Sequence, residues 1–489
     1  MNAFAGRRRE LSLLQDELDG VRDSGDGAFL WIRGRRRVGK SRLVEEFADR
    51  CGAPNVFFRA PRRELPEALR RFSSAVAESS LPSAGLFAGV APESWVAALR
   101  LAAQDATRAN PIVIVIDELP YLVERDRGFD ADLQEAWDRH LQHLPVVLIA
   151  IGSDISMMDA LTDHGHALHG RPTRELLVRP FSPAEVADLL ELEAAMAFDA
   201  YMVVGGFPAL AAAWRKSWDR RSFLEHALTD SYNQFVVNGE RILEGELGES
   251  PQARQVLEAI GAGERTFSAI RDASGVFNAA SLSNVLRLLI DAKGIVAEAS
   301  PYAAPPAKKN KRYSIADPYL RFWVRFVGPG IDEIDRGRSD LAIARIEAAW
   351  GAYRGKAIEP LVHRAVERLL PDARFGPARY VGGYWTRSND VEVDLVGADA
   401  PDPRSVAFVG SVKWRERARF GPRDTRDLIR LRSAVPGAED ALLVGVSRSG
   451  FAADAGLDVS LTPDDLLAAW DEPANAAAPV VRSAAQPGS

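Results

Sequence analysis

The stretch GRRRVGKS, from Gly34 to Ser41, decides the fold of this chain. It has the G-x4-G-K-S spacing of a Walker A loop, whose backbone N–H groups surround phosphates. The apolar run AFLWIR precedes the loop, and the amphipathic stretch SRLVEEFADR follows it. This order predicts a buried strand, a phosphate loop and a helix whose N-terminus faces the phosphates.

The residue types in the loop predict its cofactors, ATP and Mg²⁺. We predict that Lys40 pairs with the β- and γ-phosphates as a catalytic residue, and that the Ser41 hydroxyl ligates Mg²⁺. The predicted nucleotide contacts along the loop are Gly34, Arg35, Arg36, Arg37, Val38, Gly39, Lys40, Ser41 and Arg42.

Five apolar runs alternate with helical stretches, which predicts an α/β fold with a parallel sheet covered on both faces. The predicted strands are 29–33, 55–59, 112–116, 146–151 and 175–179. The third run ends in Asp117 and Glu118, a Walker B pair. Asp117 is predicted to hold the Mg²⁺ shell beside Ser41, and Glu118 to orient the attacking water.

Two further positions are candidates for the nucleotide site. Ser153 follows the fourth strand and is predicted to contact the γ-phosphate or the water, the sensor 1 role of AAA+ ATPases; a helix cap explains it as well. Arg171, before the fifth strand, is predicted to be an arginine finger, acting in cis or from a neighbouring subunit. A plain surface role for Arg171 or Arg174 stays open.

The bulk composition limits the function classes. A chain of 489 residues predicts about three domains, and a net charge of −7 confines any nucleic-acid binding to local patches. The single cysteine, Cys51, excludes an intrachain disulfide and fits a reducing compartment. The apolar runs are too short for a signal peptide or a membrane span. We therefore expect a soluble cytoplasmic protein without membrane contact.

The middle of the chain is predicted to be helical and then to form a winged helix-turn-helix. The phosphate-binding core, 1–181, is followed by a helical lid, 182–245, which opens with the capping box SPAE. Residues 246–330 show three helices and two strands joined by a basic loop. An alternative use of this module is packing or partner binding. The predicted DNA contacts are Asn284, Arg287, Lys308, Lys309, Lys311 and Arg312.

Several motifs together resemble the archaeal-type P-loop ATPases, a family related to AAA+ and STAND proteins. The motifs are FAGRRREL, GRRRVGKSRLVEEF, IVIVIDELPYL, GSDISMM, GGFP and YSIADPYLRFWVRF, and they occur in the family's order along most of the chain. The resemblance implies a P-loop ATPase core with a lid, a winged helix and a C-terminal restriction-endonuclease-like domain.

After a linker, 331–350, residues 351–472 resemble the PD-(D/E)XK nuclease-like domain of that family. The resemblance places Glu359, Asp394 and Lys413 at key positions, but the family's Glu-x-Lys appears as SVK, with Ser411 in place of the carboxylate. Glu392 is a candidate substitute because it lies on the same sheet face as Asp394. We expect a degenerate nuclease-like domain, followed by a disordered tail, 473–489.

The predicted function is an ATP-binding and ATP-hydrolysing switch that couples its nucleotide state to DNA or partner binding. The predicted partners are DNA, another protein or a second copy of the chain. One alternative is an ATP-gated, metal-dependent DNA endonuclease of the defence type. The other is a regulatory scaffold that binds ATP without hydrolysing it.

Overall fold

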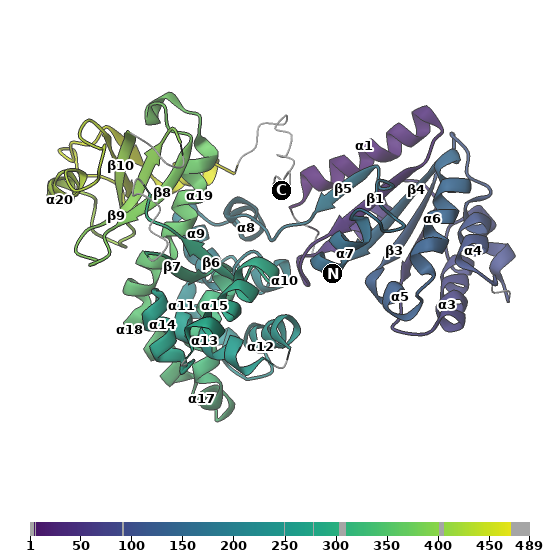
Figure 1. Cartoon of the computed structure of the whole chain (residues 1–489), viewed down its shortest axis with the longest axis horizontal. Helices are drawn as coiled ribbons and strands as arrows, with labels where there is room; N and C mark the ends of the chain where they lie inside the picture. Colours follow the sequence, from purple (N-terminus) through teal and green to yellow (C-terminus); the bar gives the residue numbers. More distant parts are fainter. Residues whose placement is uncertain are drawn as a thin grey trace. The chain divides into compact units, whose positions relative to one another are not determined.

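The computed structural model describes residues 4, 6–89, 92–248, 250–276, 278–302, 310–400 and 405–470. The chain forms two compact units (Figure 1). The first is Met1–Phe181 with Phe207–Ala209, and the second is Ser182–Gly206 with Leu210–Ser489. The predicted DNA contacts Lys308 and Lys309 and the predicted tail, 473–489, lie outside the described residues.

A five-stranded parallel sheet organises the first unit, which confirms the predicted α/β fold. Its order is β2-β3-β4-β1-β5, and the phosphate loop joins β1 to α2. The strands are β1 (Ala28–Arg33), β2 (Asn55–Arg59), β3 (Ile112–Asp117), β4 (Val146–Gly152) and β5 (Arg174–Leu177). The helices are α1 (Arg8–Ser24), α2 (Lys40–Arg50), α3 (Leu65–Ala77), η1 (Pro82–Phe87), α4 (Trp95–Ala103), α5 (Pro120–Arg125), α6 (Phe129–Arg139), η2 (Leu141–His143) and α7 (Ile155–Thr162).

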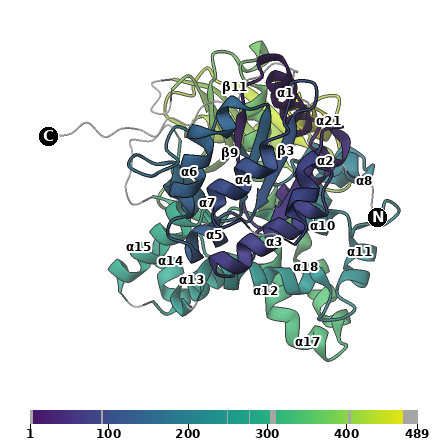
Figure 2. The ribbon, with the colours of Figure 1, turned by 90° about the vertical axis from the view of Figure 1, so that its right-hand side faces the viewer.

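Helices cover both faces of this sheet, so its central strands are buried along their whole length. On one face, Phe72 of α3 and Trp95 of α4 pack against Phe58. Figure 2 shows α3, α4 and α6 in front of the sheet. On the other face, α1 contacts β1 and β4 and buries Leu14 and Leu18. Because β1, β3 and β4 pair in parallel, their carboxyl ends lie at the same edge of the sheet, and the motif residues lie there.

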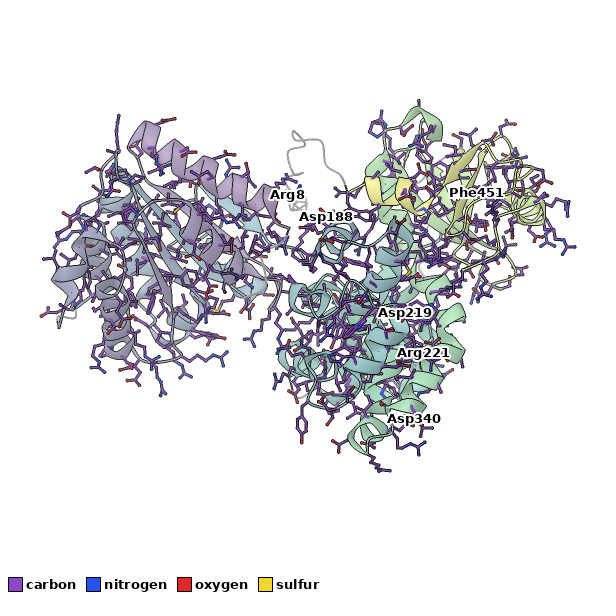
Figure 3. All side chains as sticks on the ribbon, turned by 180° about the vertical axis from the view of Figure 1, so that it is seen from behind. Arg8, Asp188, Asp219, Arg221, Asp340 and Phe451 are labelled. Carbon is purple, nitrogen blue, oxygen red and sulfur yellow. The ribbon has the colours of Figure 1, made fainter. Side chains whose placement is uncertain are left out.

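The second unit begins with helices. Ser182 and Glu185 form the predicted capping box at the start of the first of these. Asp219 accepts a hydrogen bond from the Ser222 N–H and caps another, in which Arg221 pairs with Glu225 (Figure 3). The helices of this region, one of which crosses the unit boundary, are α8 (Pro183–Leu190), α9 (Ala194–Val204), α10 (Pro208–Ala211), α11 (Arg220–Ala227) and α12 (Gln234–Leu247).

Three helices and an antiparallel hairpin follow, in the predicted order. They are α13 (Pro251–Ala262), α14 (Phe267–Ser274), α15 (Ala279–Arg287), its π-helical continuation η3 (Leu288–Ala292), β6 (Val296–Ala299) and β7 (Arg312–Ile315). No single helix among the described residues is long and apolar enough to cross a membrane; the bent pair 267–274 and 279–292 passes that test by length and composition only.

The stretch 331–350, predicted as a linker, lies mostly in helices. α18 buries Ala342, Ile343, Ile346 and Trp350 along one side, a helical spacing that the sequence already contains. The elements here are α16 (Pro318–Phe322), η4 (Trp323–Val327), η5 (Gly328–Gly330), α17 (Ile331–Asp335) and α18 (Ser339–Ala357).

The C-terminal region is a five-stranded mixed sheet of order β12-β11-β10-β9-β8. β9 runs antiparallel to β8 and β10, and β10, β11 and β12 are parallel. The elements are α19 (Glu359–Leu369), η6 (Ala373–Phe375), β8 (Tyr380–Trp385), β9 (Glu392–Ala398), β10 (Val406–Lys413), α20 (Pro422–Arg432), β11 (Leu442–Ser447), β12 (Val459–Leu461) and α21 (Pro463–Ala468). Strands β8 and β12 and helix α21 are not predicted by the sequence pattern.

Candidate functional site

The phosphate loop holds Lys40 in a buried position at its end. Gly34 has φ 159°, and a Cβ there would lie 2.4 Å from the Val178 carbonyl oxygen, so the loop needs glycine at this position. Lys40 is 6% exposed, and its Nζ donates to the carbonyl oxygens of Gly34 at 2.7 Å and Arg35 at 2.9 Å. Burial lowers the pKa of Lys40 to about 8, while the negative charges of Glu118 and Asp117 act in the opposite direction.

Asp117 lies where β3 ends, beside the start of α2. The Ser41 hydroxyl donates to Asp117 Oδ1 at 3.1 Å, which brings together the two predicted Mg²⁺ residues. Asp117 is 1% exposed. Arg59, at the end of the neighbouring strand β2, donates from Nε to Asp117 Oδ2 at 3.1 Å. A buried carboxylate beside a hydroxyl is a donor set that suits a hard cation such as Mg²⁺.

Glu118, the predicted water-orienting residue, is held by Ser153. The Ser153 hydroxyl donates to Glu118 Oε2 at 2.8 Å, so Ser153 contacts the Glu118 carboxylate. Glu118 has φ 58°, a left-handed conformation that is uncommon for this residue type and is found at strained functional turns. The helix cap that the sequence offered as an alternative belongs to the next residue, Asp154, whose carboxylate caps α7.

Other loop arginines contact neighbouring side chains. Arg36 donates to the Tyr121 hydroxyl at 3.5 Å, and Arg42 pairs with Glu46 at 2.8 Å. These residues line the same loop as Lys40, so the fold places the predicted contacts 34–42 together.

Arg171 lies at the wrong end of the sheet for a finger in cis. Its neighbour Thr173 donates its N–H to the carbonyl of Phe29, near the start of β1, whereas the phosphate loop follows the end of β1. Gly34 lies five positions after Phe29, a distance of about 16 Å along an extended strand. Arg171 itself pairs with Asp138 at 3.0 Å. The cis role is therefore wrong for this structure, and a role from a neighbouring subunit stays a prediction.

Arg7 and Arg59 contact the site but were missed as site residues. Arg7 is 5% exposed, donates to the carbonyls of Val38 at 2.9 Å and Arg179 at 2.5 Å, and lies 4.7 Å from the centre of the Phe181 ring. It thereby links the phosphate loop to the segment after β5. Its only signal in the sequence was its place in the FAGRRREL motif, and Arg59 had none.

Glu359, the first residue of α19, and Asp394, on β9 of the C-terminal sheet, are both partly buried. The Asp394 carboxylate accepts from the Ser411 hydroxyl at 3.1 Å and from the Val412 N–H at 2.9 Å. Ser411, which stands where the resemblance led us to expect a carboxylate, thus hydrogen-bonds Asp394. Burial raises the pKa of Glu359 to about 6, and the nearby Lys356 opposes this shift.

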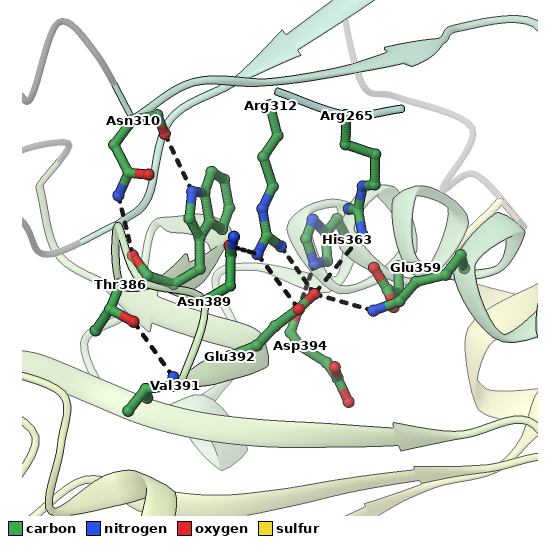
Figure 4. A network of polar contacts seen from close by, with 12 residues as sticks. Arg265, Asn310, Arg312, Glu359, His363, Thr386, Asn389, Val391, Glu392 and Asp394 are labelled. Atoms are coloured by element: carbon green, nitrogen blue, oxygen red, sulfur yellow. Dashed lines mark hydrogen bonds and ion pairs between the residues drawn. The ribbon is translucent and has the colours of Figure 1, made fainter. Parts of the chain in front are cut away.

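Cationic side chains engage the carboxylate of Glu392, the candidate substitute metal ligand, in this structure. Three cationic side chains surround it: Arg312 at 2.8 Å, Lys356 at 2.9 Å and Arg265 at 3.8 Å (Figure 4). Burial alone would raise its pKa, but hydrogen bonds from Lys356 and Arg312 lower it to about 2. Since these cations already neutralise the Glu392 carboxylate, a Mg²⁺ ion would have to displace them.

Arg312 also departs from its predicted role. It is 7% exposed, donates to the Asn389 side chain at 2.7 Å and lies 4.5 Å from the centre of the Trp385 ring. It therefore cannot reach DNA in this structure. Asn284 and Arg287 are exposed on one side of α15, as a DNA contact requires, and Lys311 pairs with Glu298 at 2.5 Å.

His363 lies close to Glu359 and Asp394 and was not predicted as a site residue. It lies one helical turn after Glu359 on α19, and its Nε2 is 2.6 Å from the Asp394 carbonyl oxygen. Burial lowers its pKa, which favours the neutral ring. Lys413 is the last residue of β10. Within the described ranges, no group of three or more His, Cys, Asp or Glu side chains could hold a metal ion.

Lys40 and Ser41 beside a strand-end Asp117–Glu118 pair, on a parallel sheet of order 2-3-4-1-5, define a P-loop ATPase domain. Residues 4–210 match a family described as an ATPase domain predominantly from Archaea. Residues 323–425 match a second family, described as archaeal and bacterial proteins of unknown function. The chain thus resembles an archaeal ATPase domain in its first part and the second family in residues 323–425.

Several individual proteins are similar to this chain along most of their own length. The chain is 26% identical over 453 residues to an uncharacterized protein of Methanocaldococcus jannaschii, covering 89% of this chain and 93% of that protein. A Walker-type ATPase of Pyrococcus abyssi matches with 21% identity and a TM-score of 0.47, covering 66% of this chain and 96% of its own. The ORC2 protein of Aeropyrum pernix matches with 15% identity and a TM-score of 0.46, covering 71% and 97%.

Proposed function

We propose that this protein is a Mg²⁺-dependent ATPase that works as a switch, coupling its nucleotide state to the binding of DNA or a protein partner. One observation carries the proposal. Ser41, Asp117, Glu118 and Ser153 follow neighbouring strands and are joined pairwise by hydrogen bonds of 3.1 and 2.8 Å, beside the buried Lys40. This is the set of groups that phosphoryl transfer to water requires.

Each group has a task that its position allows. Lys40 and the loop N–H groups bind the phosphates, and Ser41 and Asp117 would hold Mg²⁺, which neutralises charge on the phosphate oxygens. Glu118 orients and polarises the water. Ser153 fixes the Glu118 carboxylate through its hydroxyl. A carboxylate placed to orient water favours hydrolysis over a scaffold that only binds ATP.

On the output side, we propose that α13–α15 with β6 and β7 form a winged helix. Its candidate contacts are Asn284 and Arg287 on the exposed side of α15, with Lys308 and Lys309 outside the described residues. Arg312 joins its hairpin to the C-terminal sheet. Because Arg312 is buried in that ion pair and Glu392 is partly buried, we infer that the winged helix and the degenerate nuclease-like domain respond to the nucleotide together.

The experiment compares ATP turnover of the wild type with Lys40→Ala and Glu118→Gln. Lys40→Ala should lose nucleotide binding, whereas Glu118→Gln should bind ATP and hydrolyse it at least 100-fold more slowly. Glu124→Gln, a change of an exposed residue on α5, is the matched control and should resemble the wild type. Equal turnover in all four proteins would rule out hydrolysis at this site.

DNA binding is tested separately by anisotropy with a short duplex, with and without a non-hydrolysable ATP analogue. Affinity should depend on the nucleotide, and Arg287→Ala should reduce the slope of affinity against salt by about one. If the duplex does not bind in either state, the coupled partner is a protein. If the protein cuts plasmid with Mg²⁺ and Asp394→Ala does not, the C-terminal domain is a metal-dependent endonuclease and not a degenerate nuclease-like domain.

A further inference from the structure

The buried carboxylate of Asp117 is neutralised by an arginine that no motif identifies. Arg59 is the last residue of β2 and lies opposite Asp117 in the register of β2 and β3. Its Nε donates to Asp117 Oδ2, while the Ser41 hydroxyl donates to Oδ1, each at 3.1 Å. One carboxylate thus holds a guanidinium and the predicted Mg²⁺ ligand side by side.

The two oxygens of Asp117 serve groups that compete. The Asp117 side chain is 2% exposed, so its charge needs a cationic neighbour. A guanidinium and a Mg²⁺ ion carry the same sign, so either one weakens the attraction of Asp117 for the other. The Arg59 side chain is 64% exposed, and its other contact is Glu45 at 3.4 Å, so little packing fixes it in place.

Phosphoryl transfer needs a cation near the transferred phosphate, because negative charge shifts among its oxygens during the reaction. Arg171 lies at the opposite edge of the sheet. Arg59 and Ser41, by contrast, donate hydrogen bonds to the same carboxylate, that of Asp117. We propose that Arg59 is a catalytic cation acting in cis, which alternates between the Asp117 carboxylate seen here and the γ-phosphate of bound ATP. This proposal rests on the proposed ATPase function.

The reaction itself leaves Arg59 covalently unchanged. The water oxygen forms a bond to the γ-phosphorus while the bond from that phosphorus to the β–γ bridging oxygen breaks. The electron pair of the broken bond stays on ADP, and the proton of the water moves to Glu118. Arg59 stabilises the charge that spreads over the phosphate during this exchange.

The test compares Arg59→Gln and Arg59→Lys with a matched control, Arg71→Gln. Arg71 also donates from Nε to a carboxylate, Glu67, at 2.9 Å, and is 54% exposed. Two quantities are measured: kcat, and the Mg²⁺ concentration that half-saturates binding of a non-hydrolysable ATP analogue. Arg59→Gln should lower kcat by roughly 10- to 100-fold. It should also lower the half-saturating Mg²⁺ concentration about two- to fivefold, because a competitor is removed. Arg59→Lys should restore part of kcat.

The opposite directions of these two effects separate catalysis from simple support. An unchanged kcat in Arg59→Gln overturns the proposal. A lower kcat together with weaker Mg²⁺ binding also overturns it, since Arg59 would then only hold Asp117 in place. If the wild type hydrolyses no ATP, the proposed function fails; the Mg²⁺ titration then decides alone, and an unchanged half-saturation refutes the competition on which Arg59's role depends.

Discussion

Glu359→Gln should stabilise the C-terminal domain at neutral pH. The pKa of Glu359 is raised from 4.5 to about 6 by burial, so the ionised form is disfavoured by folding. A shift of 1.5 units corresponds to about 2 kcal/mol at pH values above both pKa values. Lys356 loses one partner in the variant but keeps Glu392 at 2.9 Å. We therefore expect a net gain of about 1 to 2 kcal/mol at pH 7.5.

The sign of the pH dependence follows from the same shift. Because the folded pKa lies above the unfolded one, the folded state binds more protons between pH 4.5 and 6, and wild-type stability falls as the pH rises through that window. The gain of the variant over the wild type should therefore shrink towards zero near pH 4.5. Hydrogen exchange of peptides from α19 and β9 measures the local free energy of opening. Glu367→Gln, an exposed change on the same helix, is the control.

Two outcomes would refute this reasoning. One is a variant that is no more stable than the wild type at pH 7.5. The other is a gain that stays constant down to pH 5, which would mean that the titration of Glu359 is not its source. A third arm adds Mn²⁺: if the wild type alone is stabilised by the metal, Glu359 is a metal ligand and the nuclease-like domain is not degenerate.

Three further predictions concern both units. Since the pKa of Lys40 is about 8, nucleotide affinity should weaken about tenfold between pH 7 and pH 9, and binding at pH 8.5 should take up a proton, measurable by calorimetry in two buffers. Ser153→Ala should lower kcat about tenfold with KM nearly unchanged, because it frees the Glu118 carboxylate; an unchanged kcat contradicts this role. Asp199→Ala leaves the largely buried Arg448 without its carboxylate and should cost about 3 to 5 kcal/mol in thermal unfolding, and a loss below 1 kcal/mol would count against it.

The ATPase half of the molecule could be predicted because its signals are local. A phosphate loop is a continuous stretch whose spacing follows from the shape of a phosphate, and apolar runs such as β3 and β4 report burial on both faces. The carboxyl ends of parallel strands meet at one edge, so Ser41, Asp117 and Ser153 were predicted as neighbours before any distance was known. The hydrogen bond from Ser153 to Glu118 was not, since it depends on side-chain rotamers.

The remaining contacts depend on partners far apart in the sequence. The basic stretch around Arg312 predicts a DNA contact, but Arg312 pairs with Glu392, which lies 80 residues further along the sequence. Arg171 was placed by analogy of sequence position, but β5 pairs in parallel with β1, so the segment before β5 lies at the amino ends of the strands. Strand β8 was missed because its Gly382–Gly383 pair and polar flanks hide the alternation of a strand.

The Arg312 cluster limits how the output side can work. Pulling Arg312 away would leave Glu392 facing only Lys356 and Arg265, and would expose a cation that now packs against the Trp385 ring. Breaking this partly buried pair costs free energy because it leaves the buried Arg312 guanidinium without its carboxylate. A nucleotide-driven movement of this region therefore costs less free energy if the hairpin and the C-terminal sheet move as one body than if they separate. In that case, the proposed switch would control access to the exposed side of α15, which carries Asn284 and Arg287.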